Sequence, residues 1–497
     1  MSDMRGIDTL VRQRRRRVFK EVANLAYNST NLKDDCEALP YKIVDYEVSE
    51  LWENVYRDRA IIRERIRLAM GMSLRPENRE RPGHLTEGIE ESDIAEKYYE
   101  PPLMQVIPSA CNACPENKYI VTNECMGCMA HPCQEVCPKG AITFIDGKSV
   151  IDQDKCIKCG KCYQICPYDA ICHKERPCKA ACGIQAIESD SHGRAKINND
   201  KCVSCGMCMV SCPFGAIADK SQIFQLIRAM QSGRTIIAQV APAFVGQFGP
   251  NVTPDIFKTA LKELGFMDVY ETAIGADLGC IAEAEHYVRE VATGKQAFAL
   301  TSCCPSWSVM AKNLFPETID KISNELTPMV ATARIIKQEH PEAEVVFIGP
   351  CASKKLEASR RTVRSDVDFV ITFEELVGMF EAKGLLLDEI KAMDEMHDAT
   401  SAGRGYGVAG GVASAIADCI ETYHPGTPIH IEHAEGLADC KKALMLAKAG
   451  KMNGCLIEGM ACPGGCVAGA GTNLSILTAQ REVAKFKAAA EQKVPKS

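Results

Sequence analysis

The sequence predicts a multidomain chain of α+β and α/β class, with a helical N-terminal region, two small α+β modules and a larger α/β domain. Three observations support this. The chain has 497 residues, enough for several domains of roughly 150 residues each. Seventeen of its 27 cysteines lie between Cys111 and Cys212. From about residue 226, β-like runs alternate with helical stretches, as they do in α/β folds.

Composition and charge exclude several classes of protein. No apolar run approaches the roughly 18 to 20 residues needed to cross a bilayer, and no export signal is readable after the N-terminal arginines. A net charge of −7 argues against nucleic-acid binding. We expect a cytoplasmic protein with no membrane or nucleic-acid partner. In a reducing cytosol, so many cysteines indicate metal binding rather than disulfides.

Residues 1–105 contain one cysteine and many charged residues, and residues 51–70 have a helix-like pattern. We expect a helical N-terminal region that ends at the proline-marked boundary of residues 98–108. The pattern indicates no function for it. The arginines at positions 12 and 14–17 favour a solvated helix face over a binding site for phosphate or an acidic partner.

The cysteine-rich segment repeats a short unit, Cys-x3-Cys-x3-Ala-Ile. Its four copies begin at Cys133, Cys162, Cys178 and Cys208. Residues 156–167 and 202–213 extend this unit to Cys-x2-Cys-x2-Cys-x3-Cys-Pro, the bacterial ferredoxin pattern for [4Fe–4S] clusters. In that pattern three thiolates bind one cube and the fourth reaches the partner cluster. We predict two ferredoxin-like dicluster modules, at residues 106–171 and 172–225.

Crossing the fourth cysteines between paired runs assigns three clusters. The ligand sets are Cys125, Cys128, Cys133 and Cys166; Cys156, Cys159, Cys162 and Cys137; and Cys202, Cys205, Cys208 and Cys182. Zinc on the same cysteines is the alternative. Zinc sites rarely come as four consecutive thiolates with this spacing.

The second module is incomplete, because its first run lacks two ligands. Our preferred fourth set takes an upstream Cys-x2-Cys pair and consists of Cys111, Cys114, Cys178 and Cys212. A cluster that uses Cys172 is the competing interpretation, and His173 as a ligand is another. The remaining alternative has no fourth cluster and several inert buried thiols.

Three turn-rich segments of the α/β domain place cysteine where backbone can approach a bulky inorganic ligand: residues 301–307, 349–357 and 458–466. A fifth cubane could bind to Cys304, Cys351, Cys462 and Cys466. Cys303 would remain free, and a thiol with an ordinary pKa of about 8.5 beside a metal site is a candidate proton donor or acceptor. No GxGxxG turn signals a nicotinamide or flavin site.

These three segments closely resemble the signature motifs of the [FeFe]-hydrogenases, and the resemblance extends over residues 106 to about 480. It implies a catalytic domain at residues 226–485, followed by a C-terminal tail at 486–497. That domain would carry the H-cluster, a cubane joined to a diiron subcluster with CO, cyanide and a bridging dithiolate amine. The four cysteines named above would hold the cubane, with Cys466 as the bridge to the diiron unit.

The resemblance also implies roles for side chains around the diiron unit. Cys303 would relay protons, Lys354 would hydrogen-bond a cyanide, and Met460 would pack beside the carbonyls. The other implied cofactor contacts are Ala241, Pro242 and Ser353.

The implied proton path departs from the family pattern. Glu283 and Ser323 occupy the usual carboxylate and serine positions, whereas His286 stands where a glutamate is common and Glu290 where an arginine is common. A histidine titrates at about 6.5, so His286 either rebuilds the path or is an ordinary packed or surface histidine. Two further departures indicate a divergent subgroup: Gly349 for a frequent methionine and Ser306 for a frequent glycine.

The remaining cysteines are assigned mostly to packing: Cys36, Cys280, Cys419, Cys440 and Cys455. The glycine-rich residues 403–417 lack the Lys-Ser/Thr of a phosphate loop. We therefore expect close backbone packing at a helix start there.

The predicted activity is the reversible conversion of two protons and two electrons into H2. Three or four accessory [4Fe–4S] clusters would relay electrons to or from a ferredoxin-type carrier. Hydrogenase maturation proteins would install the diiron unit. The alternatives are a hydrogen sensor, which should carry a signalling module that we do not find in the sequence, and a non-catalytic iron–sulfur protein. Loss of the H-cluster cysteines would indicate the latter, and all of them are present.

Overall fold

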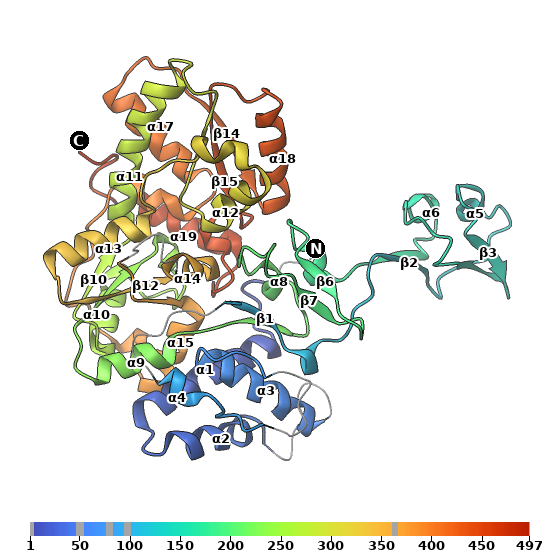
Figure 1. The fold of residues 1–497 in the computed structure, drawn as a ribbon, viewed down its shortest axis with the longest axis horizontal. Coiled ribbons are helices and arrows are strands. Elements are labelled where there is room, and N and C mark those ends of the chain that lie inside the picture. The colour runs from blue at the N-terminus through green and yellow to red at the C-terminus, as the bar shows by residue number, and fades with distance from the viewer. Residues whose placement is uncertain (1–3, 46–53, 76–82, 94–100, 360–365, 497) are drawn as a thin grey trace.

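The computed structural model describes residues 4–45, 54–75, 83–93, 101–359 and 366–496. Figure 1 shows an N-terminal helical region packed beneath a large α/β domain, and a small module that projects to one side. The multidomain α+β and α/β class predicted from the sequence is confirmed.

The N-terminal region is helical, as predicted. Its helices are α1 (Leu10–Asn28), α2 (Leu32–Ile43), α3 (Val55–Ala69) and α4 (Ile89–Ser92). The side chain of Thr9 caps α1 by accepting a hydrogen bond from the Arg12 backbone nitrogen at 3.3 Å. Val18 and Val22 of α1 belong to the same hydrophobic core as the larger sheet of the α/β domain. The N-terminal region is therefore part of the main body of the protein.

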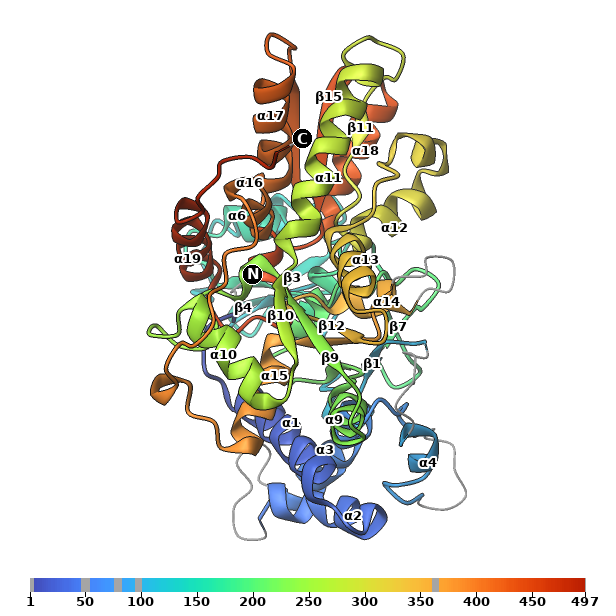
Figure 2. The same cartoon turned by 90° about the vertical axis from the view of Figure 1, so that its left-hand side faces the viewer.

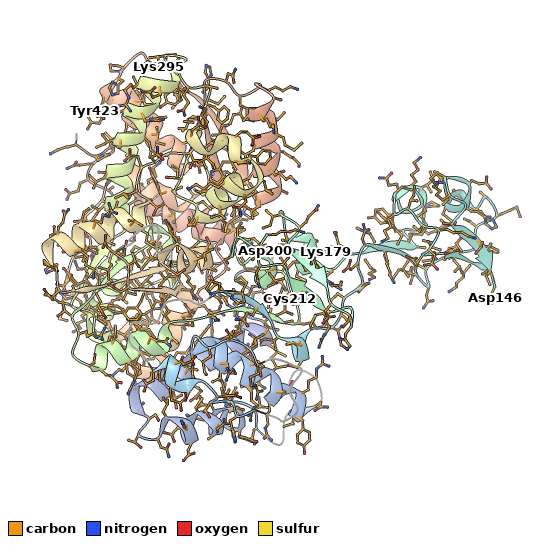
Figure 3. All side chains as sticks on the ribbon, viewed as in Figure 1. Asp146, Lys179, Asp200, Cys212, Lys295 and Tyr423 are labelled. Carbon is orange, nitrogen blue, oxygen red and sulfur yellow. The ribbon has the colours of Figure 1, made fainter. Side chains whose placement is uncertain are left out.

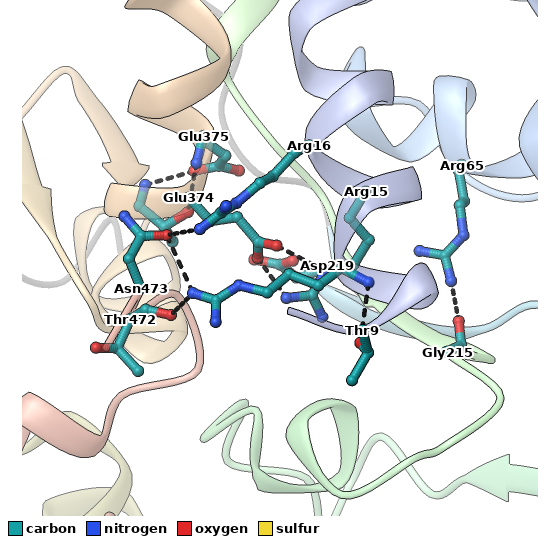
Figure 4. A network of polar contacts seen from close by, with 12 residues as sticks. Thr9, Arg15, Arg16, Arg65, Gly215, Asp219, Glu374, Glu375, Thr472 and Asn473 are labelled. Atoms are coloured by element: carbon teal, nitrogen blue, oxygen red, sulfur yellow. Dashed lines mark hydrogen bonds and ion pairs between the residues drawn. The ribbon is translucent and has the colours of Figure 1, made fainter. Parts of the chain in front are cut away.

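The arginine run of α1 is not a solvated face, so that expectation was wrong. Arg12 and Arg14 are only 8% and 5% exposed. Arg12 donates to the Thr472 carbonyl at 2.9 Å, and Arg15 pairs with Glu374 (Figure 4). Carbonyls and carboxylates of distant segments thus replace water around these guanidinium groups.

The two ferredoxin-like modules are nested. In the module that projects in Figure 1, β2 (Lys118–Val121) pairs antiparallel with β5 (Ile171–Lys174). We call residues 117–174 the outer module. It also contains α5 (Pro132–Glu135), β3 (Ile142–Ile145), β4 (Lys148–Ile151) and α6 (Lys161–Ile165).

The outer module is inserted into a second one, the inner module, formed by residues 104–116 and 175–219. This module is closed by β1 (Met104–Val106), which pairs antiparallel with β8 (Ile217–Asp219). Its other elements are η1 (Pro108–Ala110), α7 (Pro177–Ala180), β6 (Ile187–Ser189), β7 (Ala195–Ile197) and α8 (Met207–Val210). The boundaries expected after residues 105 and 171 fall inside β1 and β5. Periodicity did not reveal them, because they depend on pairing between strands far apart in sequence.

The α/β domain contains two parallel sheets. The larger has the order β10-β9-β12-β13, and its strands are β9 (Ile236–Val240), β10 (Asp268–Glu271), β12 (Glu344–Gly349) and β13 (Phe369–Thr372). The smaller has the order β11-β15-β14, and its strands are β11 (Ala299–Leu300), β14 (His430–Glu435) and β15 (Cys455–Met460). The β-like runs at residues 235–244, 297–302, 343–350 and 367–372 correspond to β9, β11, β12 and β13. The mostly solvent-accessible β14 lacks an apolar run to reveal it.

Helices surround the two sheets (Figure 2). The α-helices are α9 (Ile223–Gln231), α10 (Pro254–Leu264), α11 (Ala273–His286), α12 (Pro305–Leu314), α13 (Pro328–Glu339), α14 (Ala352–Ala358), α15 (Phe373–Lys383), α16 (Ser401–Arg404), α17 (Gly411–Tyr423), α18 (Leu437–Lys448) and α19 (Ile476–Ala488). The short 3-10 turns are η2 (Pro242–Phe244), η4 (Pro316–Lys321), η5 (Leu387–Glu389), η6 (Gly405–Gly407) and η7 (Cys466–Ala468), and α11 continues into a π-helical turn, η3 (Tyr287–Val291). Within the described ranges, no helix combines the length and the apolar character needed to cross a membrane.

The ends of the α/β domain also differ from the expected boundaries. The boundary expected after residue 225 falls inside α9, and the one expected after residue 485 falls inside α19. Residues beyond α19 pack onto the domain, since the carbonyls of Gln492 and Lys493 accept hydrogen bonds from the first turn of α16 at 2.8 and 3.0 Å.

Candidate active site

The three cysteine segments of the α/β domain meet at the carboxyl ends of its two parallel sheets. Cys303 and Cys304 follow β11, Cys351 follows β12, and Cys462 and Cys466 follow β15. In parallel sheets the loops at this edge are where ligands bind, because they converge on one crevice.

Helix starts and tight turns hold these cysteines. Cys304 and Cys351 occupy the N-cap positions of α12 and α14. The turn before Cys466 contains Gly464 and Gly465, with φ of 91° and 89°. A Cβ on Gly465 would also lie 2.3 Å from the Ala409 nitrogen, so only glycine fits this close approach.

Four thiols of this edge are electrostatic neighbours. Burial raises the pKa of Cys304 to about 11 and that of Cys466 to about 12, and Cys351 adds to both rises. Burial also raises the pKa of Cys462, with further contributions from Cys351 and Cys304. Cys304, Cys462 and Cys466 keep some accessible surface, yet burial is the largest cause of each raised pKa. Iron binding must therefore displace protons from these thiols.

A buried cation lies beside the four thiols. Lys354 is 8% exposed, and its Nζ donates to Glu357 Oε2 at 2.6 Å. Burial lowers the pKa of Lys354, but Glu357 outweighs that effect and Cys351 and Cys303 add to the rise. Lys354 is thus a fixed positive charge beside the four thiols, and Thr327 orients Glu357 by donating to its Oε1 at 2.7 Å.

The other implied cofactor contacts lie at the same edge. Ala241 and Pro242 follow β9, and Met460, which is 2% exposed, ends β15. Ser353, in the first turn of α14, has its Oγ 3.1 Å from Cys351 Sγ.

Cys303 differs from the sequence-based expectation of an ordinary thiol. Burial raises its pKa well above the usual value, with contributions from Glu458, neighbouring thiols and Glu283. The pKa expected from the free amino acid was therefore wrong, because the thiol has left water and faces carboxylates. At neutral pH, Cys303 holds its proton.

Glu283 has the properties of a proton carrier. Burial raises its pKa to about 7, while a hydrogen bond with Ser323 lowers it. Its Oε2 is buried without a hydrogen-bond partner among the described residues. A carboxyl that titrates at neutral pH can both accept and release a proton.

His286 and Glu290 continue the line of Glu283 along α11 and its π-helical turn, at three and seven residues further on. His286 is half-buried. The pKa of Glu290 is lowered by a hydrogen bond from Arg289 and, to a smaller degree, by His286. The structure thus places His286 between Glu283 and an accessible carboxylate.

Both motif departures have structural counterparts. A Cβ on Gly349 would lie 2.6 Å from the Phe347 ring, so that ring occupies the space beside β12. Ser306 is 1% exposed, and its Oγ donates to the Val203 carbonyl at 2.9 Å. Since Val203 lies between Cys202 and Cys205, this bond ties α12 to a cysteine loop of the inner module.

Sequence reasoning did not assign two polar residues near the site. Glu458 accepts backbone hydrogen bonds from Gly410 and Ala413, both at 2.8 Å, at the start of α17. Tyr406 is 8% exposed, and Glu283 and Cys303 contribute to its raised pKa after burial. Glu458 is the first residue of the cysteine segment 458–466, and Tyr406 lies in the glycine-rich residues 403–417.

The close backbone packing predicted for the glycine-rich segment is confirmed. A Cβ on Gly411 would meet the Gly405 carbonyl oxygen at 1.9 Å. The five cysteines assigned to packing are all buried: Cys36, Cys280, Cys419, Cys440 and Cys455.

The outer module gathers its cysteines around a small core. Cys133 and Cys162 belong to that core, and Cys137, Cys156 and Cys166 pack against it. Cys125 and Cys128 lie in the turns before α5, and Cys159 is exposed. Figure 3 shows how far this module projects, with Asp146 labelled at its far end.

The inner module brings together two further groups. Cys202 and Cys182 contribute to the raised pKa of Cys205 and of the buried Cys208, after the effect of burial itself. Cys205 also neighbours Cys304, which places this group next to the four thiols of the α/β domain.

The upstream pair joins the fourth group. Burial raises the pKa of Cys178 to about 12, with contributions from Cys212, Cys111 and Cys114. Cys208 has Cys178 as a neighbour, so this group adjoins the preceding one.

Cys172 and His173 lie on β5 of the outer module. Cys172 is opposite Ile120 in the β2–β5 ladder. His173 stacks on Tyr119 with ring centroids 4.6 Å apart, and its Nε2 lies 2.7 Å from Asn117 Oδ1.

The cysteine groups fit [4Fe–4S] clusters. Backbone nitrogens donate hydrogen bonds at 3.2 to 3.5 Å to the sulfurs of Cys111, Cys137, Cys156, Cys182, Cys202 and Cys212. Such hydrogen bonds stabilise the thiolate form, which is the form that binds iron. In the described ranges, no three His, Cys, Asp or Glu side chains are arranged to hold one metal ion.

Comparison with protein families agrees with this arrangement. The family "Iron only hydrogenase large subunit, C-terminal domain" matches residues 234–470. The chain is an [FeFe]-hydrogenase-like protein. The family "4Fe-4S binding domain" matches residues 148–171 and 195–218, in the outer and inner modules of this hydrogenase-like chain.

Its relatives include hydrogenases and assembly proteins. Iron hydrogenase 1 of Clostridium pasteurianum is 29% identical over 388 residues, which cover 67% of each chain. Cytosolic iron-sulfur assembly component 3 of Bos taurus is 26% identical over 276 residues, covering 45% of this chain and 58% of that protein. A solved [FeFe]-hydrogenase from Chlamydomonas reinhardtii matches with a TM-score of 0.44 and 24% identity, over 52% of this chain and 86% of that one.

Proposed function

We propose that this hydrogenase-like protein is a hydrogenase that interconverts protons, electrons and H2. The observation that carries the proposal is the convergence of four thiols and Lys354 at one sheet edge, with the protonated thiol of Cys303 beside the pocket. When bound, the diiron part of the H-cluster supplies the centre at which two protons and two electrons combine. Cys304, Cys351, Cys462 and Cys466 are the proposed cubane ligands.

The chain's own residues supply protons. Cys303 holds one at neutral pH, because burial raises its pKa. Glu283, an electrostatic neighbour whose pKa is about 7, can restore a proton to Cys303 after each transfer. We propose that Ser323 orients Glu283 and that His286 links it to solvent through Glu290.

Electrons would pass along the nested modules through four accessory [4Fe–4S] clusters. The order is supported by the neighbours described above: outer module, then the group containing Cys178, then the group containing Cys205, then the Cys304 pocket. A ferredoxin-type carrier is the proposed partner at the outer module. We place the protein in the cytoplasm, a reducing compartment that keeps cysteines available as cluster ligands.

The relatives named as iron–sulfur assembly proteins suggest the alternative function, a non-catalytic role in iron–sulfur cluster assembly. A protein that only carries or assembles iron–sulfur clusters has no need for a free thiol, a buried carboxyl titrating near neutrality and a buried lysine at one pocket. Cys303, Glu283 and Lys354 therefore favour catalysis over assembly.

Infrared spectroscopy tests the proposal. The full chain is produced anaerobically with hydrogenase maturation proteins, and we expect bands of iron-bound CO and cyanide. Cys466→Ala should lose those bands, while Cys455→Ala, which alters a buried cysteine at the opposite end of β15, should keep them. A matured protein without such bands would reject the hydrogenase and favour the assembly-type function.

A further inference from the structure

The fourth cysteine group lies at the neck between the two modules. The chain leaves the inner module just after Cys114 to form the outer module and returns just before Cys178. Electrons moving between the outer module and the active site must pass this group, which rests on the cluster assignment of the proposed function. Figure 3 labels Cys212 in the inner module.

Two buried arginines flank the neck. Arg176 is 3% exposed, and it donates to the Cys114 carbonyl at 2.9 Å and to the Gly193 carbonyl at 2.7 Å. Arg65, on α3 of the N-terminal region, is 7% exposed and donates to the Gly215 carbonyl, three residues after Cys212 (Figure 4).

The turn after Cys212 is shaped around the N-terminal region. Gly215 has a φ of 58°, and a Cβ there would lie 2.4 Å from a methyl of Val11 and 2.7 Å from an Arg65 guanidinium nitrogen. The N-terminal helices therefore pack directly against the loop that carries Cys212, a proposed cluster ligand.

Both guanidinium groups add positive charge at the neck. Burial lowers the pKa of Arg65 to about 10, which still leaves it charged at neutral pH. In the described ranges no carboxylate forms an ion pair with Arg65. Arg176 lies 3.3 Å from Glu116, which also pairs with Lys179 at 2.8 Å. Arg65 also has Arg15 and Glu374 as electrostatic neighbours, and their opposite charges cancel. Arg65, Arg176, Lys179 and Glu116 then leave a net charge of +2.

We infer that Arg65 and Arg176 raise the reduction potential of the cluster held by Cys111, Cys114, Cys178 and Cys212. Reduction adds one electron to an already anionic cluster, and a nearby buried cation stabilises the more negative state. The N-terminal region thereby contributes to electron transfer, although its only cysteine is Cys36.

The test is a redox titration of the full chain followed by electron paramagnetic resonance. The protein is produced with its iron–sulfur clusters but without the diiron maturation proteins, so hydrogen chemistry plays no part. Arg65→Gln should shift one cluster potential downward, and the affected signal should be the one that Cys111→Ala removes. Arg65→Lys, which keeps the charge, should have a cluster potential close to that of the unmodified chain.

Arg63→Gln is the matched control, since Arg63 lies on the same helix and pairs at 3.3 Å with Glu37, which follows Cys36 and no proposed cluster ligand. If Arg65→Gln lowers the iron content, Arg176→Gln provides the same titration from the other side of the neck. Unchanged potentials, a shift equal to that of Arg63→Gln, or an equal shift in Arg65→Lys would each overturn the inference. None of these results would affect the hydrogenase proposal, which depends on the infrared bands.

Discussion

A buried lysine joins the inner module to the α/β domain, and its removal should destabilise both. Lys355 is fully buried, and its Nζ donates to Asp219 Oδ2 and Glu375 Oε1, each at 2.7 Å, and to the Lys220 carbonyl at 3.0 Å. Asp219 ends β8 of the inner module, whereas Glu375 lies in the first turn of α15. Lys355→Met would leave two buried carboxylates without their shared cation.

Breaking a buried ion pair from one side costs about 3 to 5 kcal/mol. With an unfolding entropy of about 2.1 cal/mol/K per residue, a domain of roughly 250 residues loses roughly 8 °C in Tm for a cost of about 4 kcal/mol. Adding Asp219→Asn and Glu375→Gln to Lys355→Met should recover much of this loss, because the buried charge is then gone.

Thermal unfolding of the cluster-loaded protein, followed by calorimetry, measures the effect. Lys442→Met is the control, since Lys442 is 74% exposed and pairs with Asp439 at 2.8 Å, an interaction worth about 0.5 kcal/mol. A Tm for Lys355→Met equal to that of Lys442→Met would refute the reasoning. So would a triple variant less stable than Lys355→Met.

Three further outcomes are expected. Burial raises the pKa of Glu283 from 4.5 to about 7 in the folded chain. Between pH 4.5 and pH 7 the unfolded chain therefore binds fewer protons than the folded chain, and stability falls as pH rises. Glu283→Gln should flatten that slope in unfolding measured from pH 5 to 8 and slow hydrogen turnover by about 100-fold or more; an unchanged slope and rate would contradict this role. Ser306→Gly should cost about 1 kcal/mol in chemical unfolding by losing its bond to the inner module, and a neutral change would deny that bond any importance. Cys178→Ser should lower bound iron by about four ions per chain in elemental analysis, whereas Cys172→Ser should not; the opposite pattern would move the fourth cluster to Cys172.

The cysteine spacing predicted many of the cluster ligands, because ferredoxin ligands lie close together in sequence. Spacing alone left the fourth ligand set open among alternatives, because Cys114 and Cys178 are separated by the whole outer module. Only the pairing of β1 with β8 shows that the inner module surrounds the insertion.

Electrostatic environment was the least predictable property. The arginine run looked solvated because charge patterns along one helix do not show what packs against it. The pKa of Cys303 and the environment of Arg65 likewise depend on tertiary burial and on residues distant in sequence, such as Glu458 for Cys303 and Cys212 for Arg65. By contrast, β9 and β12 were predictable because they are continuous buried apolar runs.

Hydrogen production from reduced viologen by the matured protein tests the central claim most directly. We expect turnover in the unmodified chain and in Cys455→Ala, and a loss of at least about 100-fold in Cys303→Ala with its CO and cyanide bands intact. Full activity in Cys303→Ala would contradict the proton route through this thiol. A matured chain that carries the bands but produces no hydrogen would contradict the assignment as a hydrogenase.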